Sequence, residues 1–250
     1  MTRQFFLAAN DRTGDSFHIR GPEASHMVRV LRYREGQELL FFDGQGGRFQ
    51  GRIESIHPDG SISGRLSELP PAPAALSIEL YQGLIKASRW EWVLEKGTEL
   101  GVSAFIPVVC ARSVVIPRDG RLSSQRQRWE RIALSAAKQS RRASLPVIRE
   151  PVSFERAIGE ARTEGAGFFA WERRAEGGFE ELRGALSRAR GSRAKRARLF
   201  VGPEGGFEPG EAEQAGQAGL TLFGLGPRVL RAETAAIAAV SILLYELEAE

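Results

Sequence analysis

The sequence predicts an α/β protein in which a parallel-sheet domain follows a small β-barrel domain. Short apolar runs separated by turn residues fill positions 1–70, and strand and helix patterns alternate after residue 74. Between them lies Pro70-Pro71-Ala72-Pro73. Proline fixes φ and lacks an N–H donor, so this stretch continues neither a strand nor a helix and is typical of a linker. We therefore expect one domain at residues 1–72 and a second at 73–250.

The first seventy residues carry the signals of short strands joined by tight turns. Asp43-Gly44-Gln45-Gly46 and His57-Pro58-Asp59-Gly60 are turn sequences of the kind that join hairpin strands. The expected elements are a short helix at 23–31 and strands at 17–19, 38–42, 47–53, 53–56 and 61–66. Many short strands with little helix are typical of a small barrel.

The rest of the chain alternates between apolar strand runs and helical periodicity. The expected strands are 76–82, 104–109, 167–171, 198–201 and 220–223. The expected helices are 88–100, 123–140, 153–163, 178–190, 209–218 and 233–248. This alternation favours a parallel sheet covered on both faces. Ligands of such sheets bind beyond the carboxyl ends of the strands, so the loops there are the candidate sites.

The distribution of charge points to an anionic partner. The first 72 residues are neutral, with nine basic and nine acidic residues, so residues 73–250 carry the whole net charge of +4. Basic residues cluster at 118–142 and 183–198, and such clusters attract RNA phosphates. A solvated basic surface explains the second cluster equally well, because arginine is abundant throughout and only four of the 35 cations are lysine.

Cysteine and histidine are too few for several classes of protein. The single cysteine, Cys110, excludes a disulfide framework, and three scattered histidines beside it argue against a zinc site. We therefore expect no metal. No run of 18 apolar residues occurs, which argues against a membrane span and favours a cytoplasmic protein.

The loop after the expected strand 198–201 has an unusual composition. The strand runs directly into Gly202-Pro203-Glu204-Gly205-Gly206, and a helix is expected to follow at residue 209. Glycines let the backbone approach a ligand closely. No Lys-Ser/Thr follows, and Glu204, Glu208 and Glu211 crowd the loop, which argues against a phosphate-binding P-loop. A ligand that combines positive charge with a nucleoside fits better.

The loop after the expected strand 220–223 is the second candidate site. Gly224-x-Gly226 contains only part of the dinucleotide fingerprint, because the third glycine is missing, so we set a dinucleotide aside. The helix expected at 233–248 opens with small and apolar residues around most of its circumference. Such a helix is buried on nearly all sides. A close helix neighbour explains this composition, and a dimer interface is an added possibility.

Both loops resemble known motifs. Residues 199–207 (LFVGPEGGF) and 225–235 (LGPRVLRAETA) resemble the two C-terminal signatures of the SPOUT methyltransferases, and most closely those of the ribosomal RNA small-subunit methyltransferase E family. Three further segments agree with that family in the same order: HMVRVLR at 26–32, QGLIK with WVLEKGTELG between 82 and 101, and AAKQSRR at 136–142.

The resemblance implies both a fold and an activity. The fold is a PUA-like β-barrel followed by a SPOUT-type, trefoil-knotted parallel-sheet domain that forms a homodimer. The activity is methylation of N3 of a uridine in the 16S rRNA of the small ribosomal subunit, with S-adenosyl-L-methionine as cofactor. Sequence periodicity does not show a knot, so that expectation depends on the resemblance alone.

The resemblance also implies roles for individual residues. We expect the cofactor to contact Trp171, Glu172, Gly202, Pro203, Glu204, Gly205, Gly206, Leu225, Gly226, Val229, Leu230, Thr234 and Ala235. RNA-binding candidates are Arg29, Arg32, Lys86, Arg141, Arg142 and Arg228. Candidate catalytic groups are Arg231 and Arg228, which would stabilise negative charge on uracil, and Glu204 or Glu172 as proton acceptor. For Glu204, orienting the base, contacting the sulfonium and capping the following helix stay open.

Two alternative functions stay open on the sequence. A barrel beside a basic domain is compatible with a non-catalytic RNA-binding or ribosome assembly factor, which recognises RNA by shape and phosphates. A SPOUT methyltransferase acting on a different RNA position, such as a ribose 2′-hydroxyl, is the nearer alternative. Glycine-rich cofactor loops disfavour the first of these, because a protein that only binds RNA does not need them.

Overall fold

The computed structural model of the chain describes residues 3–72, 76–114, 122–161, 165–172, 178–191 and 194–248. The chain folds into two compact units. Unit 1 consists of Met1–Pro73 together with Ala137–Leu145, and unit 2 of Ala74–Ala136 together with Pro146–Glu250. No local feature of the sequence groups 137–145 with the N-terminal residues, and the boundary at residue 72 stays a prediction.

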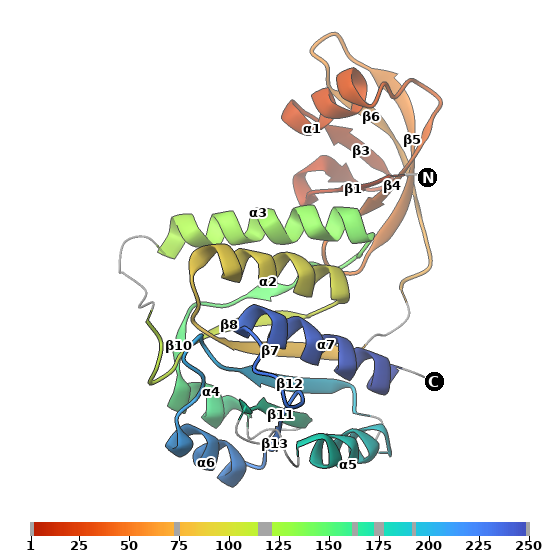
Figure 1. Cartoon of the computed structure of the whole chain (residues 1–250). Helices are drawn as coiled ribbons and strands as arrows, with labels where there is room; N and C mark the ends of the chain where they lie inside the picture. The colour runs from red at the N-terminus through yellow and green to blue at the C-terminus, as the bar shows by residue number, and fades with distance from the viewer. Residues whose placement is uncertain are drawn as a thin grey trace. The chain divides into compact units, whose positions relative to one another are not determined.

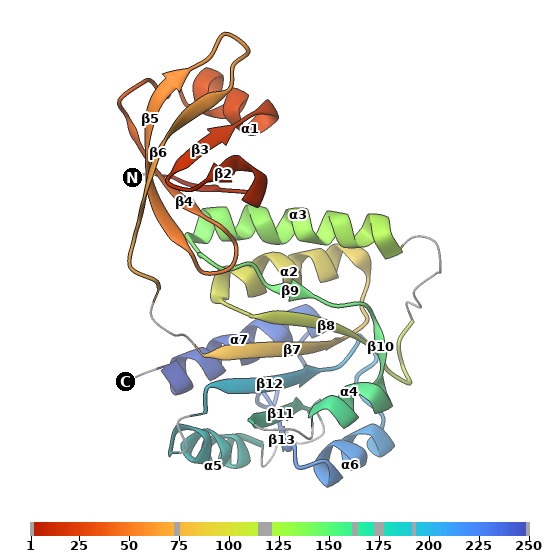
Figure 2. The same cartoon turned by 180° about the vertical axis from the view of Figure 1, so that it is seen from behind.

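Unit 1 is built on a six-stranded sheet with the order β1-β4-β5-β6-β3-β2. Figure 1 labels all of these strands except β2, which Figure 2 labels. β1 and β4 are parallel and the other pairs are antiparallel. The strands are β1 (Gln4–Phe6), β2 (Arg12–Thr13), β3 (Ser16–Ile19), β4 (Glu38–Phe42), β5 (Arg48–Ile56) and β6 (Ile62–Glu68). The helical turns are η1 (Ala9–Asp11), α1 (Gly21–Ser25) and η2 (His26–Val30), of which η2 is a π-turn.

The expected strands of unit 1 are present, with one error and two omissions. The strands expected at 47–53 and 53–56 are one strand, β5, because a β-bulge between Ile53 and Ser55 bends it without ending it. β1 and β2 were not expected, because runs of two or three residues carry too little periodicity. Phe5, Phe17 and Phe41 lie at the centre of the core.

The segment 137–145 is tied to the rest of unit 1 by main-chain and side-chain interactions. Gly46 N–H donates to the Ala143 carbonyl (3.2 Å), and Leu145 N–H donates to the Gly44 carbonyl (2.8 Å). Lys138 lies 2.7 Å from the Glu23 carboxylate on α1. These long-range interactions, which no local pattern predicts, attach the segment to the N-terminal sheet.

Unit 2 contains a parallel sheet with the order β10-β8-β7-β12-β11-β13, and β9 pairs with β8; Figure 2 shows β8, β7, β12 and β11 in succession. The strands are β7 (Ser77–Gly83), β8 (Ala104–Val109), β9 (Val147–Ile148), β10 (Val152–Ser153), β11 (Ala166–Ala170), β12 (Arg196–Val201) and β13 (Thr221–Phe223). The helices are α2 (Ala87–Leu100), α3 (Leu122–Ser140), α4 (Phe154–Ala161), α5 (Gly178–Gly191), α6 (Pro209–Gln217) and α7 (Ala232–Glu248).

Helices cover both faces of this sheet, as the strand–helix alternation predicts. Successive residues of a strand point to opposite faces, and Leu199 and Phe200 of β12 belong to different cores. The first core packs against α2, α5 and α7, and the second against α4 and α6. α2 and α7 pack against each other (Figure 1). Residues 162–163 of the helix expected at 153–163 lie outside the described residues, and the knot stays a prediction.

Candidate functional site

A cavity of about 340 Å³ lies at the carboxyl edge of the unit 2 sheet. Its walls are the loops that follow β11, β12 and β13, together with the start of α7. The lining residues are Arg89, Ala170, Trp171, Glu172, Val201, Gly202, Pro203, Glu204, Gly205, Gly206, Leu225, Gly226, Arg228, Val229, Leu230, Arg231, Ala232 and Ala235. The position beyond the strand ends agrees with the general rule for open parallel sheets.

The cavity brings together nearly all the residues expected at the cofactor. Thr234 is the exception: it is exposed in the first turn of α7 and does not line the cavity. The four catalytic candidates Arg228, Arg231, Glu204 and Glu172 all line it. Their individual roles stay predictions.

Gln82 and Gly83, at the end of β7, hold the glycine-rich loop in place. The buried Gln82 amide donates to the Gly202 carbonyl (3.0 Å). A Cβ at Gly83 would overlap the Pro203 nitrogen, so only glycine admits the loop this close. Gln82 was not among the residues predicted from the sequence. Gln82 lies on the same strand face as Ile78 and Leu80, and a polar side chain on that apolar face is the signal that would have found it.

Two of the acids that crowd the loop have structural roles. Glu208 is the N-cap of α6, and Glu208 and Glu211 form a capping box there. The Glu211 carboxylate is buried and also accepts a hydrogen bond from the Ala111 N–H (2.9 Å). Arg112, in the same loop after β8, donates to the Gly205 carbonyl (3.2 Å). These contacts hold the loop after β8 against the glycine-rich loop.

Glu204 does not cap the helix that follows it, so that possibility is excluded. Its Oε1 accepts hydrogen bonds from the Lys86 N–H (3.2 Å) and from Arg89 Nη1 (3.2 Å). Lys86 is the N-cap of α2, whose own side chain provides no cap. Glu204 therefore satisfies the start of α2 from a remote loop and places negative charge at the positive end of that helix.

The cavity has the size and the groups that S-adenosyl-L-methionine requires. Pockets for small ligands usually exceed about 300 Å³. The buried Trp171 Nε1 has no hydrogen-bond partner among the described residues, so it is available to a ligand. A Cβ at Gly206, where φ is +69°, would lie 2.5 Å from Glu172 Oε1, so this carboxylate lies against the glycine-rich backbone. The residues present therefore fit the cofactor.

Comparison with known proteins agrees with this geometry. The RNA methyltransferase domain family matches residues 72–244, and the RNA methyltransferase PUA domain family matches residues 19–66. The ribosomal RNA small subunit methyltransferase E of Bacillus subtilis is 35% identical over 237 residues, which cover 93% of this chain and 91% of the relative. The chain belongs to the ribosomal RNA small subunit methyltransferase E family.

Further family members and solved structures are similar over the whole chain. The methyltransferase E of Mycobacterium bovis is 31% identical, covering 94% of this chain and 88% of the relative. The crystal structure of the Neisseria gonorrhoeae methyltransferase E, bound to S-adenosyl methionine, matches with a TM-score of 0.82 at 27% identity and covers 97% of both chains. A putative methyltransferase from Legionella pneumophila in complex with the same cofactor matches with a TM-score of 0.77 at 27% identity, and also covers 97% of both chains. The expected fold class is confirmed.

The RNA-binding candidates that lie in unit 1 differ in how far their side chains are exposed to solvent. Arg29, Arg32 and Arg141 are exposed. Arg142 is partly buried, which lowers the pKa of its guanidinium to about 10, and its Nε donates to Ser144 Oγ (3.4 Å). Arg142 is therefore less available to RNA than its place in the sequence motif predicts. Lys86, in unit 2, is exposed.

Arg32 and Arg141 have an unusual backbone conformation. Both have φ of +59°, in the left-handed region that favours glycine. Each residue follows the end of a helical segment, and the next residue's N–H donates back into that segment: Tyr33 to the Met27 carbonyl and Arg142 to the Ala137 carbonyl, both at 3.0 Å. The bond after Arg141 spans five residues and is the Schellman arrangement, in which glycine is the usual residue; the bond after Arg32 spans six residues and closes the π-turn η2. Two arginines thus occupy positions where they cost stability.

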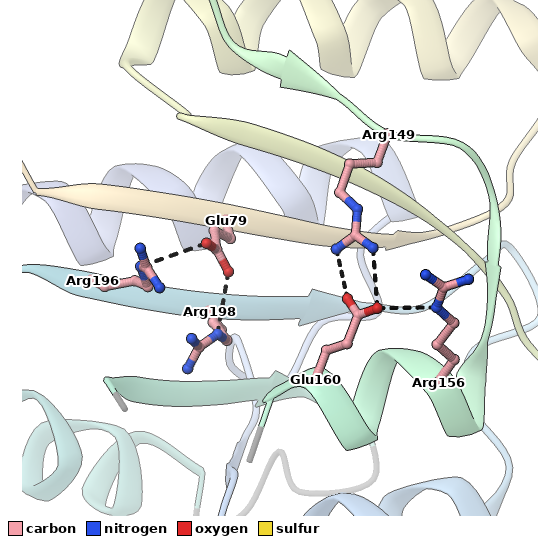
Figure 3. Close-up of polar contacts among 6 residues, drawn as sticks. All are labelled: Glu79, Arg149, Arg156, Glu160, Arg196 and Arg198. Carbon is pink, nitrogen blue, oxygen red and sulfur yellow. Dashed lines mark hydrogen bonds and ion pairs between the residues drawn. The ribbon is translucent and has the colours of Figure 1, made fainter. Parts of the chain in front are cut away.

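The described cations of the basic cluster at 183–198 are exposed except for Arg198, and three of them pair with acids. Arg198 is 3% exposed and lies 3.2 Å from Glu79, which also pairs with Arg196 at 3.6 Å (Figure 3). Arg190 pairs with Glu246. The expectation that the cluster directs its charge outward is wrong for Arg198, because its strand register places it opposite an acid.

Some cations of the two basic clusters lie outside the described residues: Arg118, Arg121 and Arg193.

Within the described ranges, His, Cys, Asp and Glu side chains form no group of three or more suited to a metal ion, and the expectation of no metal stays a prediction. No helix in the same ranges is long and apolar enough to cross a membrane.

Proposed function

We propose that this protein transfers the methyl group of S-adenosyl-L-methionine to N3 of a uridine in the 16S rRNA of the small ribosomal subunit. The observation that carries the proposal is the cavity in which a glycine-rich loop, three arginines and two carboxylates meet. When bound, the cofactor supplies an electrophilic methyl group. Family membership supports the choice of a ribosomal substrate.

The chain's own residues must hold the base and remove a proton. The N3 proton leaves before the nitrogen lone pair attacks the methyl carbon, and the sulfur keeps the electrons of the broken bond. Arg228 and Arg231 line the cavity and are suited to stabilise the negative charge that spreads onto the uracil carbonyl oxygens. Glu172 is the better candidate for the proton acceptor. The Glu204 carboxylate already accepts hydrogen bonds from the Lys86 N–H and from Arg89.

RNA binding and assembly complete the proposal. Arg29, Arg32 and Arg141 bind phosphates, since they are exposed cations without a structural reason to be arginine.

The protein forms a two-fold homodimer through α7, where Tyr245 is 78% exposed beside the half-buried Ile237 and Ile242. Sedimentation of an active 27.5 kDa monomer at micromolar concentration contradicts this dimer. A ribosomal substrate places the protein in the cytoplasm.

The experiment that tests this function is methyl transfer to small subunits isolated from cells that lack the modification. Purified protein and labelled cofactor should methylate the 16S rRNA, and mass spectrometry of the digested RNA should find the methyl group on the uracil base. A methyl group on the ribose supports the 2′-hydroxyl alternative. No transfer, together with no cofactor binding by calorimetry, supports the non-catalytic RNA-binding alternative.

A further inference from the structure

Arg89, on the first turn of α2, lies between two carboxylates that come from different walls of the cavity. Its Nη1 is 3.2 Å from Glu204 Oε1, in the loop after β12. Its Nε is 3.7 Å from Glu233 Oε1, in the first turn of α7. Arg89 itself lines the cavity. One guanidinium therefore connects the glycine-rich loop and the start of α7, which are nearly thirty residues apart in the chain.

These charges are partly shielded from solvent. The side chains of Arg89, Glu204 and Glu233 are 32%, 22% and 14% exposed. Glu233 Oε2 is buried without a hydrogen-bond partner among the described residues, so Arg89 is the cation that the structure places beside this carboxylate. Removing one partner of a shielded ionic group costs more than removing a surface pair, because the remaining charges stay unneutralised.

We propose that Arg89 is a positioning residue that fixes the spacing of the two cofactor-binding walls. The inference rests on the proposed function, since it assumes that S-adenosyl-L-methionine binds between these walls. A planar guanidinium presents donors in several directions and bonds two carboxylates at once, whereas an ammonium on a flexible stem does not hold both in a fixed geometry. Arg89 acts on the cofactor through Glu204 and Glu233 and does not take part in proton transfer.

Glu204 has a second contact, which attaches the glycine-rich loop to α2 independently of the Arg89 side chain. The Lys86 N–H, which also donates to Glu204, belongs to the start of α2. The glycine-rich loop is thus attached to a helix end as well as to Arg89. With Arg89 removed, Glu204 keeps that helix contact, while Glu233 loses its cation and the two carboxylates repel each other. The wall formed by residues 225–233 is then expected to move away from the glycine-rich loop.

The test measures cofactor affinity by calorimetry on the full-length protein without RNA. Arg89→Met should weaken S-adenosyl-L-methionine binding about tenfold, which corresponds to about 1.4 kcal/mol. Arg89→Lys should weaken binding about threefold, since one carboxylate keeps a cation. In methyl transfer, Arg89→Met should raise KM for the cofactor while kcat at saturation stays within about twofold, as expected when ground-state and transition-state binding are lost equally.

A second substitution separates repulsion between the carboxylates from general damage to the fold. Glu233→Gln in the Arg89→Met background should restore affinity to within about threefold of the wild type, because it removes the unneutralised charge. The matched control is Arg128→Met, which removes an ion pair with Glu91 on the same helix α2 and should leave affinity unchanged.

The possible outcomes distinguish this inference from the proposed function. Wild-type protein that binds no cofactor overturns the proposed function. Wild-type protein that binds, with an Arg89→Met variant of equal affinity, overturns this inference alone. A lower kcat at unchanged affinity, or an Arg89→Met defect that Glu233→Gln does not relieve, also overturns it, since either result indicates misfolding or a direct catalytic role.

Discussion

Replacing Arg141 with glycine should make the protein more stable and a weaker RNA binder at the same time. Arg141 has φ of +59° at the end of α3, where the Arg142 N–H bonds back to the Ala137 carbonyl. The left-handed conformation costs a residue with a Cβ about 1–2 kcal/mol. Glycine removes this strain but adds about 0.5–1 kcal/mol of unfolded-state entropy. The net gain is about 0.5–1 kcal/mol, or a Tm increase of roughly 1–4 °C for a chain of this size.

The same substitution removes one exposed cation. If Arg141 contacts a phosphate, the slope of log affinity for 16S rRNA against log salt should fall by about 0.7–0.9. Urea unfolding and filter binding at several salt concentrations measure the two effects on the same preparation. The control is Arg156→Gln, which removes an exposed arginine of ordinary backbone geometry outside both basic clusters and should change neither quantity much. A stabilised Arg141→Gly variant that keeps the wild-type salt slope would refute the assignment to RNA.

Three further changes test the site and its surroundings. Gly83→Ala should weaken cofactor binding at least tenfold by calorimetry, because a Cβ that overlaps the Pro203 backbone displaces the glycine-rich loop. Glu211→Ala should lower the free energy of unfolding by about 2–3 kcal/mol in urea, since it removes a capping box and leaves a main-chain N–H unpaired. Neutralising Lys195 and Arg188 together should reduce the salt slope of RNA binding by about 1.5, whereas Arg198→Gln should leave the slope unchanged and destabilise the fold by about 3 kcal/mol.

Each of these has an outcome that contradicts it. Unchanged cofactor affinity in Gly83→Ala means that the loop is not held by this close approach. Glu211→Ala unfolding at the same urea concentration as Glu213→Ala, an exposed glutamate on the same helix, removes the capping argument. A reduced salt slope in Arg198→Gln means that this side chain reaches RNA.

The strands and helices of unit 2 were predictable because the local signals are long. Four of its strands span five to seven residues and carry several apolar side chains each, and each expected helix overlaps an observed one. Helical periodicity and glycine-containing ends mark these elements independently of their partners. β9 and β10 are two residues each, so their existence depends on pairing with β8 and not on a pattern of their own.

The sequence predicted which loops form the site, but it did not predict the contacts that hold those loops together. The glycine-rich loop and the Leu225–Ala235 segment were found from their composition and from resemblance, and the cavity lies between them. Arg89, Gln82 and Arg112 were missed. A basic side chain in a helix or loop has no local feature that separates a ligand-site wall from an ordinary surface, whereas Gln82 does carry a signal, because it is a polar residue on the apolar face of its strand. Their roles became visible through distances to Glu204, Gly202 and Gly205.

The sequence by itself determined the order of the elements, the parallel sheet and the glycine-rich loops, since each depends on residue types within a few positions of one another. Only the tertiary structure decided which of the basic side chains are exposed to solvent and which are buried. Arg198 and Lys195 are close neighbours in a basic run, but Arg198 is opposite Glu79 in the next strand and is buried, while Lys195 is exposed. Whether a cation binds RNA or stabilises the fold depends on the acid that strand register places beside it, and residues 79 and 198 meet only when the sheet forms.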